Sequence, residues 1–174
     1  MSSNKKAIRQ IVGYTFAEVG ADPTGWFDQA QKFNTAANLL YDQDSLLQVC
    51  LHVAGLSLEL GFKAILIAKS KSLATTHTLV ELASQAGVTF SADQECTLEL
   101  LAECIIWRGR YPTPKSENHW DRFHDKILEK HIIHKQDGNV YSTLVHKQRF
   151  PTQDNYQAIW IIVEREFNLL VKNP

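Results

Sequence analysis

Apolar residues recur at steps of three and four along most of the chain, the spacing that gathers them on one face of an α-helix. The first clear segment starts at Asp22-Pro23, a capping side chain followed by a proline suited to the first helical position. A second segment starts at Asp44 or Ser45 and runs to about Lys69. Apolar residues cover most of its circumference, which predicts a central, buried helix.

Two capping boxes, Thr78/Glu81 and Ser91/Gln94, predict the starts of the next helices, because the side chains at each box satisfy the first free backbone N–H groups. Gly87 would end the first of them. The remaining periodic segments predict a helix in each of these ranges: 91–107, 116–130, 153–172 and, more weakly, 5–17.

The predicted fold is therefore all-α, an antiparallel bundle of four to six helices joined by short connections. The chain has 174 residues, the length of one domain. Asp137-Gly138-Asn139 predicts a turn, and residues 140–148 are either a loop or a short strand. We divide the single helical domain into an N-terminal extension (1–21), a helical core (22–110), an irregular segment with one helix (111–151) and a C-terminal helix (152–174).

Composition restricts the functional classes. Hydrophobic residues make up 44% and charged residues 21%, which indicates a globular chain. The net charge of −1 removes any whole-chain argument for binding nucleic acid or an anionic membrane, although a local basic patch could still do so. No run reaches the roughly 18 apolar residues of a membrane span, so we expect no membrane association. Three cysteines without close spacing favour a reducing, cytoplasmic compartment.

Glu59 and Lys63 lie four residues apart on the most apolar helix, so they share a face. On an exposed face the pair would contribute only about 0.3 to 0.5 kcal/mol. On a buried face each ion would need further partners, because it loses its hydration. Residues 107–112 are the segment from which we expect those partners.

Arg108, Arg110 and Tyr111 end a helix next to a rigid Pro-Thr-Pro segment. Arginine binds carboxylates or phosphates through two parallel hydrogen bonds, and an aromatic ring offers a stacking face for a base. These residues are candidate ligand-binding groups, together with Lys63. The alternative is structural, because cations at a helix C-terminus offset its dipole and an arginine could pin the loop to Glu59.

Histidines are numerous, but no pattern identifies a metal site, and HExxH is absent. Four of the seven lie between positions 119 and 134, where a solvated polar helix face accounts for them. His77 precedes a helix start and would cap it, pack, or join Arg110. No nucleophile elbow, phosphate loop or dinucleotide-binding motif occurs, so we expect no cofactor and no metal.

Three segments in order resemble a HEPN domain: LSLELGFKAILIAK, THTLVELASQAG and WRGRYPTP, which follow an aromatic and alanine-rich first helix. The resemblance covers residues 24–115. It implies a four- or five-helix bundle, a homodimer packed through its helices, and a place among prokaryotic toxin, defence and nucleotidyltransferase-partner proteins. A nucleotidyltransferase or an antitoxin is then the expected partner.

This sequence departs from the family's ribonuclease members, which carry an arginine followed, after four to six intervening residues, by a histidine. No arginine here has a histidine at that spacing; Arg110 to His119 is too long, and Arg122 to His124 is too short. Our first hypothesis is a noncatalytic module that binds RNA, a nucleotide or a protein, with Glu59 and His77 orienting the basic residues. The alternative is a divergent metal-independent ribonuclease in which Arg110 stabilises charge and His119 or His124 transfers protons.

Overall fold

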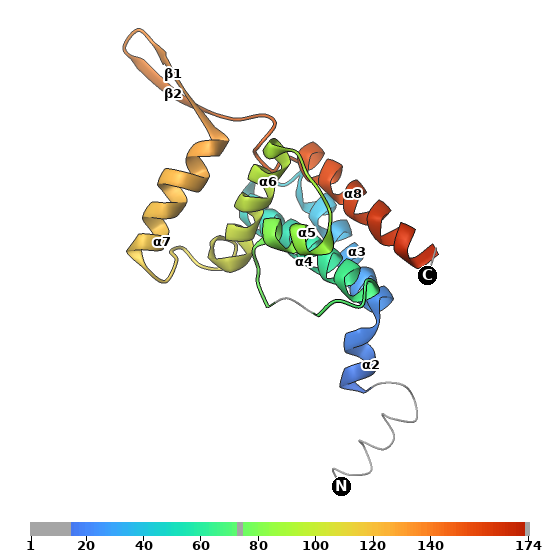
Figure 1. The fold of residues 1–174 in the computed structure, drawn as a ribbon. Helices are drawn as coiled ribbons and strands as arrows, with labels where there is room; N and C mark the ends of the chain where they lie inside the picture. The colour runs from blue at the N-terminus through green and yellow to red at the C-terminus, as the bar shows by residue number, and fades with distance from the viewer. Residues whose placement is uncertain (1–14, 73–74, 173–174) are drawn as a thin grey trace.

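The computed structural model describes residues 15–72 and 75–172, which are mainly helical and include one two-stranded sheet (Figure 1). The all-α prediction is therefore confirmed for most of the described chain, and the small sheet is the exception to it. The predicted N-terminal helix over residues 5–17 falls almost entirely outside the described residues. The helices are α2 (Phe16–Ala21), α3 (Pro23–Leu40), α4 (Leu47–Ala68), α5 (Leu79–Ala86), α6 (Ala92–Glu103), α7 (Glu117–Arg122) and α8 (Gln153–Lys172).

Helix α4 is the centre of the main core, as its apolar circumference predicts, and it packs against α3, α5, α6 and α8. Phe27 of α3 stacks on Phe167 of α8 with ring centroids 4.0 Å apart. The segment Asp44–Ala68 is long and apolar enough to cross a membrane, but 67% of its most apolar window is buried in the protein. A core helix of a soluble protein has the same properties, so this is weak support for a membrane span.

Two of the three predicted capping interactions, at Asp22 and Ser91, are confirmed, and the one at Thr78 is not. Asp22 accepts hydrogen bonds from the backbone N–H groups of Thr24 and Gly25, and Ser91 forms the predicted capping box with Gln94. The box at Thr78 is wrong: Thr78 makes no side-chain capping bond. The carboxylate of Glu81 instead accepts from the Gln85 amide one turn further along the helix.

Residues 117–131 form one helical stretch, in which α7 continues as a π-helical turn (η3, Phe123–Ile127) and a 3₁₀ turn (η4, Leu128–His131). A second, smaller core holds this stretch against α6 through Leu100, Trp107 and Phe123. The chain then forms an antiparallel hairpin of β1 (Ile132–Asp137) and β2 (Val140–Val145), which projects away from the helices (Figure 1). Of the two alternatives for 140–148, the strand is correct.

Candidate functional site

The end of α6 and the turn after it build the candidate site. Helix α6 continues as a π-helical turn, η2 (Cys104–Arg108), and stops at Gly109. A Cβ atom at Gly109 would lie 2.7 Å from His52 Cγ and 2.8 Å from the Cys104 carbonyl oxygen. Glycine therefore lets this turn lie directly against α4, which places Arg108 and Arg110 on either side of the contact.

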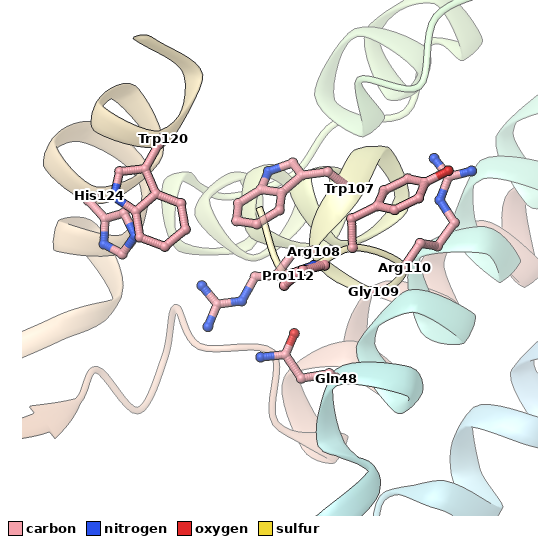
Figure 2. Close-up of a pocket in the computed structure, with 9 residues that line it drawn as sticks. Gln48, Trp107, Arg108, Gly109, Arg110, Pro112, Trp120 and His124 are labelled. Atoms are coloured by element: carbon pink, nitrogen blue, oxygen red, sulfur yellow. The ribbon is translucent and has the colours of Figure 1, made fainter. Parts of the chain in front are cut away.

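An open pocket of about 340 Å³ lies at this turn (Figure 2). The Arg108 side chain reaches into it, toward the side where Trp120 and His124 lie. The Arg108 guanidinium carbon is 4.9 Å from the centre of the Phe123 ring, so a cation–π contact holds the side chain in place. The lining residues are Gln48, Trp107, Arg108, Gly109, Arg110, Tyr111, Pro112, Trp120 and His124.

A larger pocket of about 690 Å³ adjoins the first and shares Trp107, Arg110, Tyr111 and Pro112 with it. Lys115 and His119 line only this second pocket. Both volumes lie in the range of small-molecule sites, about 300 to 1,000 Å³. Arg110 and Tyr111 therefore border two adjoining spaces, each of which contains at least one further cationic or titratable group.

Neither arginine of the site forms an ion pair with a carboxylate of the described residues. Arg110 is exposed, donates one hydrogen bond to the Ile106 carbonyl at 2.7 Å, and lies 5.4 Å from the centre of the Tyr111 ring. A guanidinium has five N–H donors, so one backbone bond leaves several unused. Among the described residues, the arginines paired with carboxylates are Arg122, Arg149 and Arg165, and neither Arg108 nor Arg110 belongs to them.

Glu59 and Lys63 form a buried ion pair at 2.6 Å, with side chains only 7% and 13% exposed. The third member is His77, whose Nδ1 lies 3.0 Å from Glu59 Oε2. We expected further partners from residues 107–112, and this was wrong: Arg110 bonds to its own helix end instead. Lys63 lines neither pocket, so the structure does not bring it together with Arg108, Arg110 and Tyr111.

Glu103, the buried carboxylate nearest the site, was not predicted from the sequence. Its side chain is 4% exposed, and Oε2 accepts from Trp107 Nε1 at 2.7 Å and lies 2.6 Å from His119 Nε2. Arg122 Nη2 donates to Oε1 at 3.2 Å. One clue was available: a buried tryptophan N–H needs an acceptor, and Glu103 lies one helical turn before Trp107.

His119 is the candidate proton-transfer residue that best fits the pocket geometry. Nε2 of His119 is hydrogen-bonded to the Glu103 carboxylate, and the imidazole ring lines the larger pocket together with Arg110. His124 lines the smaller pocket instead, and its ring lies 4.4 Å from that of Trp120. The structure thus brings Arg110 and His119 to one open space despite the long spacing between them.

The three cysteines are poor candidates for a thiolate nucleophile at neutral pH, because the pKa of each thiol is raised. Burial raises the pKa of the Cys50 thiol to about 11 and that of Cys104 to about 12, so both stay protonated. Burial also raises the pKa of Cys96. Across residues 15–72 and 75–172, no three His, Cys, Asp or Glu side chains converge in a way that could hold a metal ion.

Comparison with known families gives one result. The family model described as the HEPN domain matches residues 24–160, which is most of the chain and extends well beyond the segments that carry the resemblance. Comparison with curated proteins and with solved structures finds no match. The matched range includes both pockets, the Glu59 and Glu103 clusters, the hairpin and the first part of α8.

Proposed function

Because the chain belongs to the HEPN family, we propose that it is a noncatalytic binding module for RNA or a nucleotide, with Arg108, Arg110 and Tyr111 as the ligand-binding residues. The main support for this proposal is that two arginines without carboxylate partners line one open pocket. Tyr111 is 55% exposed and Trp120 40% exposed beside them. Guanidinium groups would bind phosphate, and the free ring faces would stack on bases.

The Glu59 cluster has a supporting role in this proposal. Glu59 and Lys63 neutralise each other inside the bundle, and His77 extends the pair to the surface. We therefore assign Lys63 to the stability of α4 and not to contact with the ligand. Within this proposal, Glu59 and His77 are likewise structural.

Binding is measured by fluorescence anisotropy with a labelled single-stranded RNA, with ATP as an unlabelled competitor. Arg110→Ala should weaken RNA binding about tenfold or more, since it removes a charge-assisted hydrogen bond to phosphate. Arg108→Ala should do the same. Arg165→Ala is the matched control, because Arg165 is exposed, lies on α8 and pairs with Glu166.

The melting temperature of each variant separates ligand binding from a structural role. Arg110 caps the end of η2, so its loss lowers stability slightly in either case. The binding proposal requires affinity to fall by far more than the small loss of folded protein explains. Equal affinities of the wild type, Arg110→Ala and Arg165→Ala for RNA and ATP would contradict it.

One observation favours a second candidate, a divergent metal-independent endoribonuclease. Arg110 and His119 line the same pocket, and the buried Glu103 carboxylate holds the imidazole by Nε2. A carboxylate that orients a histidine is the arrangement that general base catalysis uses. In this candidate Arg110 would stabilise the negative charge on the phosphate oxygens. Nδ1 of His119, the ring nitrogen that does not contact Glu103, would remove the proton of the attacking hydroxyl.

Gel analysis of labelled RNA distinguishes the two candidates. The ribonuclease would cleave the RNA equally with and without a chelator, and His119→Gln would abolish cleavage while leaving binding nearly unchanged. His124→Gln is the control, because that ring lines the other pocket. RNA that stays intact at high protein concentration for hours would exclude the ribonuclease and leave the binding module.

Family membership also supports a proposed homodimer and a nucleotidyltransferase or antitoxin as protein partner. The cytoplasmic location that we propose rests only on the three cysteines without close spacing. Light scattering on the purified chain tests the dimer. A chain that is strictly monomeric at tens of micromolar would contradict it. A nucleotidyltransferase or antitoxin gene next to this one would supply the candidate partner for a binding measurement.

A further inference from the structure

The lining of the smaller pocket suits a flat, neutral ring system. Aromatic rings and a proline form much of its wall, and none of the described residues that line it is Asp or Glu. Trp120 is 40% exposed there, and the centre of its ring lies 4.4 Å from that of His124. A nucleobase can stack on such a wall, whereas a phosphate that entered it would lose part of its hydration.

The Arg108 guanidinium is held in place and still has N–H groups to donate. Its carbon lies 4.9 Å from the centre of the Phe123 ring and over that ring. Stacking uses the face of a guanidinium and leaves the N–H groups at its edge. Within the described residues, the Arg108 side chain makes no hydrogen bond or ion pair. Arg110 is exposed and borders both pockets, so it can bind phosphate while Arg108 binds a base.

The shape of a guanidinium selects among the four RNA bases. Its two parallel N–H donors need two adjacent acceptors, and guanine offers O6 and N7 on one edge. Adenine carries an amino group next to N7, so one donor of the arginine would face another donor. Cytosine also has two adjacent acceptors, but its single ring covers less of Trp120 than a purine does. Guanine is therefore the base that satisfies both the guanidinium and the stacking surface.

Gln48 supplies the second polar contact of this pocket. It lies in the first turn of α4, and Figure 2 shows its side-chain amide pointing toward the Arg108 guanidinium. Within the described residues, the amide makes no hydrogen bond. An amide oxygen accepts hydrogen bonds, so Gln48 Oε1 can accept from the N1–H or the amino group of guanine, on the edge next to O6. Gln48 thus completes the contacts to guanine that Arg108 begins.

We propose that the smaller pocket binds a guanine base, with Arg108 on O6 and N7, Trp120 on the ring face and Gln48 on N1–H. The proposal deepens the proposed binding of RNA or a nucleotide and rests on it. It assigns Arg108 to the base and leaves the phosphate to Arg110. The module then selects its ligand by one base as well as by charge.

Fluorescence anisotropy with labelled RNA tests the base preference without any change to the protein. One probe is an oligouridine with a single central guanosine, and the matched probes carry adenosine or cytidine there. The wild type should bind the guanosine probe about tenfold more tightly than either, which is the discrimination of one two-bond contact. A 7-deazaguanosine probe keeps the ring and lacks N7, so it should bind about fivefold more weakly than guanosine.

Four variants locate the preference in the pocket. Arg108→Lys keeps the charge and loses the paired donors, so the guanosine and adenosine probes should bind equally. Arg110→Lys is the matched control and should change the affinity for all probes by the same factor. Gln48→Ala should reduce the preference by about threefold. Gln43→Ala, at an exposed position outside the pocket lining, should not change it. Thermal melting should show that all four variants fold.

The outcomes separate this inference from the proposed function. Equal affinity of the wild type for the three probes, or a preference for adenosine or cytidine, would overturn the guanine pocket and leave RNA binding intact. A guanosine preference that survives Arg108→Lys would overturn the assignment to this pocket. A wild type that binds neither the probes nor GMP would overturn both proposals. Displacement of the guanosine probe by GMP and not by AMP would support a free nucleotide as the ligand, and displacement only by guanosine RNA would support RNA.

Discussion

Oε2 of Glu103 lies 2.6 Å from Nε2 of His119, and this contact joins α6 to the start of α7 inside the protein. One helical turn earlier on α6, Glu99 pairs with Lys130 at the same distance, but its side chain is 35% exposed. The same two helical stretches are therefore linked by one buried and one partly exposed carboxylate. The two positions offer a matched comparison of how burial changes the contribution of a charge.

Glu103→Gln should lower the free energy of unfolding by about 2 to 4 kcal/mol, because His119, Arg122 and the Trp107 N–H lose a buried anion as acceptor. Glu99→Gln should lower it by no more than about 1 kcal/mol, because an exposed pair is screened by water. Urea unfolding followed by tryptophan fluorescence measures both. Equal losses at the two positions would show that Glu103 is better solvated than its burial indicates.

Lys63→Met should destabilise the protein by about 3 kcal/mol, because it leaves the Glu59 carboxylate buried with only the exposed His77 beside it. Adding Glu59→Leu should recover most of that loss, since an apolar pair of similar volume needs no hydration. Chemical denaturation of the two single variants and the double variant gives the coupling energy. Additive losses would mean that the two side chains do not depend on each other.

The helices could be predicted from the sequence because their signals are local. The start signal at Thr78 and the stop at Gly87 enclose α5 (Leu79–Ala86), and the periodic segment 153–172 matches α8 (Gln153–Lys172). Strand β1 could not be predicted, because Ile132 and Ile133 follow a helical stretch whose apolar spacing they continue. Its strand conformation depends on pairing with β2 across the turn at Gly138.

The candidate site could be predicted only in part. Arg108, Arg110 and Tyr111 are adjacent in the chain, so the helix end that carries them brings them together. Glu103 and His119 meet through the packing of α7 on α6, and no repeat or motif in the sequence encodes that contact. Long-range contacts of single polar residues therefore account for most of what the sequence analysis missed.

The stability of the protein should depend on pH through His131. This side chain is fully buried, and burial lowers its pKa from the ordinary value of 6.5. Burial outweighs the opposite effect of the Ile127 and Cys96 carbonyls, which can accept from both ring nitrogens only when the imidazole is charged. The unfolded chain thus takes up a proton more readily than the folded protein. The stabilisation is complete above pH 6.5 and is lost as the pH falls from there toward the lower native pKa.

Thermal unfolding between pH 7.5 and 5 (about one unit above and more than one below that ordinary value) measures the effect. His131→Gln should flatten the fall in stability over this range. His134→Gln, at an exposed position of the hairpin, should leave the slope as it is in the wild type. Identical slopes for the wild type and His131→Gln would show that His131 carries no proton linkage.

Gly109→Ala should destabilise the protein by about 1 to 3 kcal/mol and weaken RNA binding, because the added Cβ would overlap His52 Cγ and the Cys104 carbonyl oxygen. Relieving the overlap requires the turn to move away from α4, and Arg108 and Arg110 move with it. Gly20→Ala is the control: its Cβ meets nothing within 4 Å, and alanine favours the helix by about 0.4 to 1 kcal/mol. Urea unfolding and anisotropy measure the two effects; unchanged stability in Gly109→Ala would contradict the close approach that builds the site.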